Sequence, residues 1–180
     1  MSKKIDNIME LFIHDSYRKF NVREAARLAK SSPTTASNHL ANAAKRGLLK
    51  KEKSRNLILF SADLESQSFR DMKIYSNVKK IRDSGIVELI ENEVNFPEAL
   101  VLFGSYAKGE NKKDSDIDLF ILSESKNKLD LEKFENILGA EIQIFLHSRK
   151  EFENMKIKNK ELINNIINGI KLRGFLEVFK

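Results

Sequence analysis

The sequence predicts an α+β protein in which two small domains are joined by a helical linker. Three observations lead to this prediction. A short helix, a turn, a second helix and two strand-like runs fill the first third, helical periodicity continues through residues 67–95, and apolar strand-like runs surround two aspartates further on. We therefore expect one domain over residues 1–66, the linker over 67–95 and a second domain with a mixed sheet over 96–180.

The composition is that of an ordinary globular protein, with 41% hydrophobic and 32% charged residues and no cysteine. The absence of cysteine excludes disulfides and thiolate zinc sites and fits a reducing cytoplasm, which is the expected location. No apolar run reaches the roughly 18 residues that span a bilayer. The charged start of the chain does not resemble a secretion signal.

Positive charge is concentrated in the first third of the chain. Residues 1–60 hold 13 Lys and Arg against 5 Asp and Glu, whereas the remaining 120 residues hold 19 against 21. Such asymmetry favours an anionic partner for the basic part, with a merely solvated lysine-rich surface as the alternative.

The first domain shows clear helix boundaries. Residues 22–30 have helical spacing, Ser32 suits an N-cap, Pro33 suits the first position of a second helix, and Gly47 ends that helix. Two strand-like runs, "LLKKE" and "NLILFS", follow. This order resembles a winged helix-turn-helix domain, in which the second helix enters the DNA major groove.

The resemblance implies duplex DNA as a partner, with a module for dimerisation or spacing as the alternative. Polar and basic side chains on the outward face of the second helix and at the hairpin tip would contact bases and phosphates. These candidate DNA-binding residues are Thr34, Thr35, Ser37, Asn38, Lys45, Arg46, Lys53 and Arg55. A homodimer is expected because many such domains pair.

Residues 67–95 are expected to form one or two helices, interrupted at Ser84-Gly85, whose second half packs on the following sheet. The turn Asn95-Phe96-Pro97 marks the start of the second domain. Near the end of the chain, the apolar residues of "KELINNIINGI" at i, i+4 spacing predict a helix that packs on the core.

Two aspartates carry the chemistry of the second domain. The run "DIDLFIL" alternates as a strand, which places Ile117 and Leu119 on one face and Asp116 and Asp118 on the other. Same-face residues lie about 6.6–7 Å apart along the backbone. Two carboxylates so placed repel each other, and a divalent ion or a pair of ions would remove the conflict. Oxygen ligands without cysteine favour Mg²⁺ or Mn²⁺ over zinc.

A glycine-serine pair precedes the aspartates. Gly104-Ser105 follows the apolar strand "EALVLF" and leads into a short helical run, so its backbone N–H groups and hydroxyl could bind phosphate. Phosphate donors beside a carboxylate metal site are what phosphoryl or nucleotidyl transfer requires.

Gly104-Ser105, followed after ten residues by Asp116-Ile117-Asp118, resembles the signature of the DNA polymerase beta-like nucleotidyltransferase superfamily, and "FGSYAKGENKKDSDIDLFIL" is especially similar to its minimal, MNT-type members. The resemblance covers about residues 96–180. It implies two Mg²⁺ ions on Asp116 and Asp118, an NTP held through Gly104 and Ser105, and a phosphate contact from Lys108, which stands where many members have arginine.

The resemblance also implies a third carboxylate on a later strand, which would complete the metal site and help to deprotonate the acceptor. In "GAEIQIFLHS" both Glu141 and Gln143 alternate onto the required face. We take Glu141 as the catalytic and metal-binding residue. If Gln143 fills the position instead, the base is missing and catalysis is weak or absent.

The expected protein is a Mg²⁺-dependent nucleotidyltransferase that moves an NMP from an NTP, with ATP as the expected donor, to a hydroxyl that the sequence does not identify. Two alternatives stay open. One is a DNA-binding transcriptional regulator with a nucleotide-sensing or inactive transferase fold. The other is an antitoxin-like protein with a separate HEPN-type partner, since minimal transferases resemble antitoxins paired with such helical toxins.

Overall fold

The computed structural model describes residues 3–54, 56–125 and 127–179 of the chain. They form two compact units, Met1–Lys73 and Ile74–Lys180. Helix α4 (Gln67–Asp83) contributes its first turns to one unit and its remaining turns to the other. No helix in the described parts of the chain is long and apolar enough to cross a membrane.

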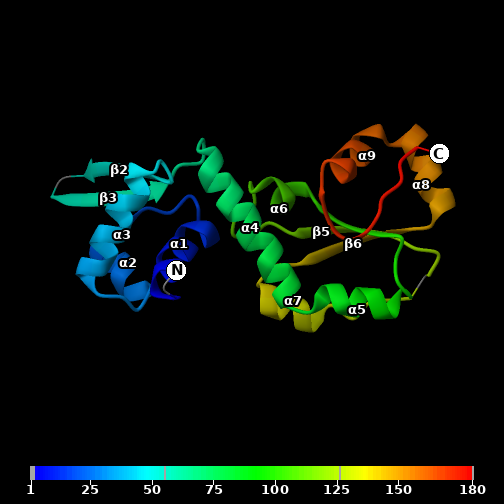
Figure 1. Ribbon diagram of the computed structural model, residues 1–180, viewed down its shortest axis with the longest axis horizontal. Helices are drawn as coiled ribbons and strands as arrows, with labels where there is room; N and C mark the ends of the chain where they lie inside the picture. The colour runs from blue at the N-terminus through cyan, green and yellow to red at the C-terminus, as the bar shows by residue number, and fades with distance from the viewer. Residues whose placement is uncertain (1–2, 55, 126, 180) are drawn as a thin grey trace. The chain divides into compact units, whose positions relative to one another are not determined.

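The N-terminal unit combines helices with a small antiparallel sheet whose strand order is β1-β3-β2. Strands β2 and β3 form a hairpin in which Leu49 lies opposite Ala62 and Ser54 lies opposite Leu57. The elements before α4 are α1 (Lys3–His14), β1 (Phe20–Asn21), α2 (Val22–Leu28), α3 (Pro33–Lys45), β2 (Leu49–Ser54) and β3 (Leu57–Ala62). Their course can be followed from blue to cyan in Figure 1.

Capping side chains set the starts of α2 and α3. The side chain of Asn21 accepts a hydrogen bond of 2.9 Å from the backbone N–H of Glu24. Ser32 Oγ accepts one of 3.1 Å from the N–H of Thr35, and Pro33 follows at the first helical position. These bonds satisfy donors that a helix start otherwise leaves open. The expected cap at Ser32 is therefore confirmed.

The C-terminal unit is built on a four-stranded mixed sheet of order β6-β5-β4-β7. Strands β5 and β6 are parallel, and the other pairs are antiparallel. After α4 the elements are α5 (Ile86–Glu93), β4 (Ala99–Phe103), α6 (Gly104–Lys108), β5 (Ile117–Leu122), α7 (Glu132–Leu138), β6 (Ile142–His147), α8 (Arg149–Lys158), α9 (Lys160–Ile167) and β7 (Ile170–Gly174).

Helices cover both faces of this sheet. Helices α5 and α7 lie on one side and α8 and α9 on the other (Figure 1). Ile86 and Ile90 of α5 are fully buried with the inward residues of β4 and β5. On the opposite face, Phe152 of α8 and Ile166 of α9 are fully buried against Phe120 and its neighbours. Burial on both faces fixes which way each side chain of β5 points.

The segment that we expected to be a linker consists of α4 and α5, and Gly85 interrupts it with a φ of 84°. Its second half packs on the sheet, as the sequence predicted, because α5 belongs to the core of the C-terminal unit. The helix expected near the end of the chain is present as α9, and the short strand β7 follows it.

Candidate active site

The two aspartates lie at the start of β5. Asp118 is the second residue of the strand and Asp116 directly precedes it. Ile117 and Leu119 are buried beneath α5 and α7, whereas Phe120 is buried beneath α8 and α9. Since strand side chains alternate, both half-buried carboxylates belong to the face that carries Phe120. This is the arrangement that the alternation in the sequence predicted.

Gly104 brings the glycine-serine turn against Asp118. Strands β4 and β5 pair so that Phe103 lies opposite Asp118, and Gly104 follows with a φ of 69°, a conformation that favours glycine. A Cβ atom added to Gly104 would overlap the carboxylate of Asp118. The backbone at Gly104 and the Asp118 carboxylate are therefore in direct contact, and only glycine permits this approach.

The environment of Asp118 disfavours its charge. Burial raises the pKa of the Asp118 carboxyl above its ordinary value, and the negative charge of Asp116 raises it further. Among the described residues, no cationic side chain forms an ion pair with either aspartate. A bound cation would relieve both the desolvation and the mutual repulsion.

Gln143 stands beside the aspartates on the neighbouring strand. In the parallel pairing of β5 with β6, Gln143 lies opposite Asp118. Its Nε2 atom donates a hydrogen bond of 2.6 Å to Oδ2 of Asp116. Because an ionised carboxylate only accepts hydrogen bonds, the amide must face Asp116 with its nitrogen.

Glu141 lies just before β6, and its side chain is exposed. Its backbone oxygen accepts a 2.8 Å hydrogen bond from the N–H of Ile117. Within the described ranges, no group of three or more His, Cys, Asp or Glu side chains is placed to hold a metal ion. The three-carboxylate set that we expected with Glu141 is therefore not assembled here. The donors of Asp116 and Asp118 fit one hard cation such as Mg²⁺.

Lys108, expected at the nucleotide phosphates, is exposed at the end of α6. Its Nζ atom donates a 3.2 Å hydrogen bond to Oδ1 of Asn165 in α9. Ser105 is half-buried in the first turn of α6. Both residues border the turn that contacts Asp118.

A buried amide network, which the sequence analysis missed, holds the loop between α6 and β5. Asn77 of α4 is 4% exposed, and its Nδ2 atom donates bonds of 2.9 Å to the backbone oxygen of Tyr106 and to Oδ1 of Asn111. Burial raises the pKa of the Tyr106 phenol, which also interacts with Asn111 and with the charge of Asp116. The signal in the sequence was slight: Asn77 lies one turn before the buried Ile81, on a helix that also buries Phe69.

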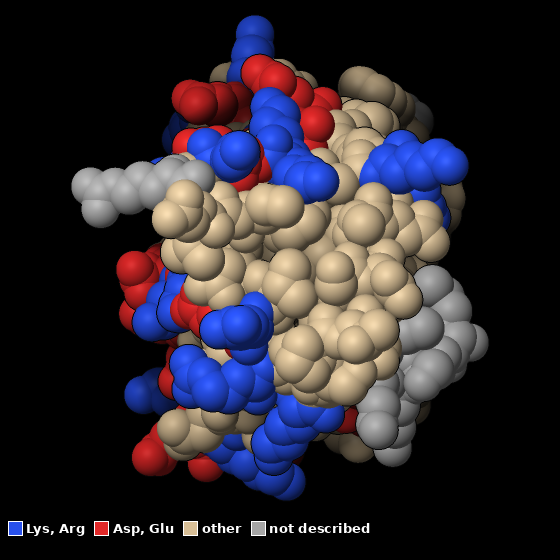
Figure 2. All heavy atoms as spheres, turned by 90° about the vertical axis from the view of Figure 1, so that its left-hand side faces the viewer, with Lys and Arg blue, Asp and Glu red and all other residues tan. Residues whose placement is uncertain are grey.

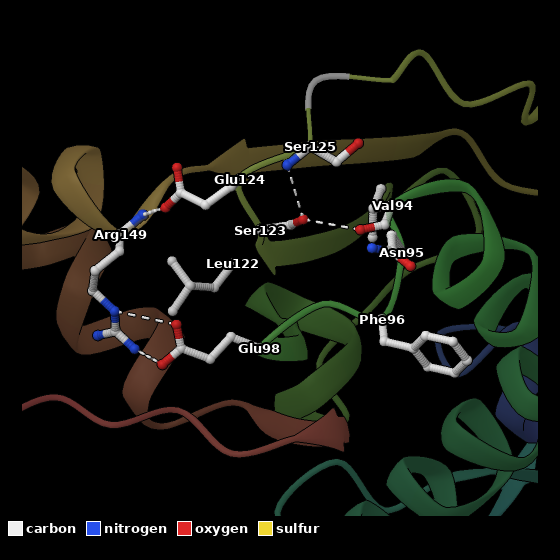
Figure 3. A pocket seen from close by; sticks show the side chains of 9 residues that line it. All are labelled: Val94, Asn95, Phe96, Glu98, Leu122, Ser123, Glu124, Ser125 and Arg149. Carbon is white, nitrogen blue, oxygen red and sulfur yellow. Dashed lines mark hydrogen bonds and ion pairs between the residues drawn. The ribbon is translucent and has the colours of Figure 1, made fainter.

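A pocket of about 510 Å³ lies at the other end of β5 (Figure 3). Glu98 and Arg149 form an ion pair in it, and Ser123 Oγ donates to the backbone oxygen of Val94 at 3.1 Å. Its lining consists of Val94, Asn95, Phe96, Glu98, Leu122, Ser123, Glu124, Ser125 and Arg149. The aspartate pair is not part of this pocket.

The candidate DNA-binding residues lie on the surface of the N-terminal unit. The predicted side chains of α3, together with Lys45, Arg46 and Lys53, are exposed, while Arg55 lies outside the described residues. Thr35 also contacts the cap, since its hydroxyl lies 2.8 Å from Ser32 Oγ. On the side of the molecule in Figure 2, Lys and Arg side chains surround an area without charged side chains.

Comparison with known proteins finds a family that most of the C-terminal unit resembles. Residues 85–172 match the family model of the nucleotidyltransferase domain. This segment begins at the glycine before α5, ends in β7, and includes Gly104, Ser105 and the aspartate pair. The chain thus contains a match to a nucleotidyltransferase domain over just under half of its length.

Among solved structures, the chain is similar to a candidate nucleotidyltransferase from Sulfolobus solfataricus, with 16% sequence identity and a TM-score of 0.32. The similarity covers 58% of this chain and 93% of the other. A TM-score of this size does not establish a common fold. None of the curated proteins matches the chain significantly.

Proposed function

We propose that the C-terminal unit transfers an NMP from an NTP, with ATP as the expected donor, to an acceptor hydroxyl, and that the reaction depends on Mg²⁺. The observation that carries the proposal is the contact between the Gly104 backbone and the Asp118 carboxylate, inside a segment that matches a nucleotidyltransferase domain. It brings a phosphate-binding type of turn and two clustered carboxylates to one place.

Each residue has a distinct role in this proposal. The N–H groups at Gly104 and Ser105 and the hydroxyl of Ser105 donate to the phosphates, and Lys108 adds positive charge nearby. Asp116 and Asp118 hold Mg²⁺, which when bound supplies charge neutralisation for the triphosphate. The acceptor oxygen forms a bond to the α-phosphorus while the bond to the bridging oxygen breaks. Pyrophosphate leaves, and the acceptor proton passes to solvent.

Labelled ATP tests the proposal. The purified chain with Mg²⁺ and candidate acceptors is expected to transfer label, and Asp116→Asn or Asp118→Asn should reduce transfer at least 100-fold because the cation is lost. Asp114→Asn is the matched control, since Asp114 is an exposed acid of the same loop. Equal transfer by Asp118→Asn and the control would contradict the proposal.

For the N-terminal unit we propose a winged helix that binds duplex DNA as a homodimer. The order of α2, α3 and the β2–β3 hairpin, the exposed polar face of α3 and the excess of basic residues support this role. The proposal leaves room for a regulator whose C-terminal unit senses nucleotide, or for an antitoxin-like protein with a HEPN-type partner. The amide at Gln143 favours those weakly catalytic alternatives.

A binding titration with random duplex tests the DNA proposal. Affinity is expected to fall steeply with salt, and Lys45→Ala/Arg46→Ala should weaken binding about tenfold through lost phosphate contacts. Lys150→Ala/Lys158→Ala in α8 removes the same charge from exposed positions and serves as the control. If both double variants lose DNA affinity equally, the loss reflects net charge alone and the proposed role of Lys45 and Arg46 is contradicted.

A further inference from the structure

We infer that the aspartate site holds one divalent cation together with its nucleotide, and not two, because Gln143 occupies the third ligand position as a hydrogen-bond donor. The inference rests on the proposed nucleotidyltransferase function and specifies its metal site. Gln143 is a positioning residue in this account, since it acts on the cation through Asp116.

The hydrogen bond commits one oxygen of Asp116. Gln143 Nε2 lies 2.6 Å from Oδ2, a short distance for a bond between an amide and a carboxylate. A neutral amide nitrogen does not ligate Mg²⁺, which takes oxygen ligands. Oδ1 of Asp116 and the carboxylate of Asp118 remain available to one ion, while Gln143 orients Asp116 as partners of ligating carboxylates commonly do.

Rotation of the amide does not produce a third anionic ligand. Turning the side chain by half a turn would place its oxygen against Oδ2 of Asp116, where two acceptors face each other. The strand pairing also restrains the position of Gln143, because β6 is hydrogen-bonded to β5 along its whole length, from Ile142 opposite Ile117 to His147 opposite Leu122.

No other acid among the described residues replaces the missing ligand. Glu141 is exposed at the start of β6, and no cluster of three acidic or imidazole groups is formed. Two cations about 3.5–4 Å apart need anionic ligands that bridge and flank them. One oxygen of Asp116 is bonded to the Gln143 amide. The remaining carboxylate oxygens of Asp116 and Asp118 can ligate one cation, which the triphosphate also ligates.

The consequence is a site that binds Mg²⁺–NTP but gives the acceptor hydroxyl no cation of its own. Binding of the donor nucleotide and activation of the acceptor are then separate properties. Restoring a carboxylate at position 143 should add the second cation without altering the first.

Electron paramagnetic resonance of Mn²⁺ tests the inference on the full chain with a non-hydrolysable ATP analogue. Two Mn²⁺ ions a few ångströms apart couple magnetically, whereas a single ion gives an uncoupled spectrum. We expect one uncoupled Mn²⁺ per chain in the wild type and in Glu141→Gln. Gln143→Asp and Gln143→Glu should bind two coupled ions, and Gln143→Ala should keep one ion with about tenfold weaker affinity.

Coupled ions in the wild type, or loss of an ion in Glu141→Gln, would overturn the inference and make Glu141 the third ligand. The inference would also be overturned if Gln143→Asp and Gln143→Glu both melt at the wild-type temperature and neither binds a second ion. Other results would contradict the proposed function. These are a wild type that binds no Mn²⁺, or an Asp118→Asn variant that binds Mn²⁺ as tightly as the wild type. Thermal melting of each variant separates loss of the ion from loss of the fold.

Discussion

At its C-terminal end, β5 runs into a pocket where the Glu98 carboxylate is paired with the Arg149 guanidinium. The Arg149 side chain also donates a 2.8 Å hydrogen bond to the backbone oxygen of Glu177. The backbone N–H of Arg149 donates one of 3.0 Å to the Glu124 carboxylate (Figure 3). At its N-terminal end, the amide of Gln143 donates to one oxygen of Asp116. Among the described residues, the first end holds an ion pair and the second holds two carboxylates that form none. That difference distinguishes a structural ion pair from the site at which we propose an external cation.

The largest effect is expected from Gly104→Ala, which tests whether the carboxylate end depends on a close backbone approach. The methyl group would overlap Asp118 and also force alanine to a φ of 69°. We expect loss of nucleotide binding and a fall of about 3 kcal/mol in the free energy of unfolding, measured by urea titration.

Gly139→Ala is the matched control for this variant. Gly139 has the same φ of 69° but no atom within 4 Å of an added Cβ. It should cost only about 1 kcal/mol, the conformational part alone, and leave nucleotide affinity unchanged. Equal effects of the two alanines would show that the contact with Asp118 is unimportant.

Asn77→Ala should have the next largest effect, because it leaves buried acceptors on Tyr106 and Asn111 without their donor. We expect about 2 kcal/mol of destabilisation in chemical unfolding. Nucleotide affinity should fall as well, since the loop that ends at Asp116 loosens. Lys79→Ala on the exposed side of the same helix should leave stability almost unchanged, because its ion pair with Asp83 is solvent-exposed. If Asn77→Ala binds nucleotide with the wild-type affinity, the buried amide network does not support the nucleotide site.

Arg149→Leu tests the opposite end of β5. The change removes the partner of Glu98 and the bond to Glu177, so stability should fall by about 1.5 kcal/mol in thermal or urea unfolding. Mn²⁺ and nucleotide affinity should not change, because the pocket is separate from the aspartates. Lys150→Leu, at the exposed neighbouring position, is the control. A loss of nucleotide binding in Arg149→Leu alone would show that the two ends act together.

Asp118→Asn should give the smallest change in stability, and it should raise stability where the other variants lower it. The raised pKa of Asp118 means that the folded chain binds this proton more tightly than the unfolded chain. The resulting stabilisation is fully present below the unfolded-state pKa and is lost as the pH rises through the folded-state value. At pH 7 without metal, the variant should therefore be slightly more stable than the wild type.

Unfolding curves at several pH values check the sign for Asp118. The difference in stability between variant and wild type should close as the pH falls below about 3, where the carboxyl group is largely neutral in both states. Mg²⁺ should stabilise the wild type and not the variant. A gap that widens at low pH would mean that Asp118 is stabilised as a carboxylate in the folded chain.

Local patterns in the sequence predicted much of this structure. The Ser32 cap, the break at Gly85 and the alternation around Asp118 depend on neighbouring residues, so they can be found by reading along the chain. The choice between Glu141 and Gln143 as the residue beside the aspartates could not be made in this way. Glu141 and Gln143 have the same local pattern, and only the pairing of β6 with β5 places Gln143 opposite Asp118.

The buried amides show the same limit. Asn111 stands in the run "GENKKDSD", which has the composition of a solvated loop, yet it is 7% exposed because Asn77 from a distant helix reaches it. A contact across 34 positions leaves no local signature. Prediction from sequence therefore succeeded for the elements that it named, such as α3 and β5, and for the shared strand face of the aspartates. It did not predict α1, α7 or α8, and it failed for the side chains that depend on tertiary pairing.

Gln143 also has a genetic meaning. A glutamine codon becomes a glutamate codon by substitution of its first base alone, so the chemistry of this centre is one point mutation from a fully acidic ligand set. Under the one-cation proposal, a lineage that carries this gene would pass between a one-cation and a two-cation site by this change, without redesigning the fold. Selection on that base, more than on the scaffold, would determine which of the two the organism keeps.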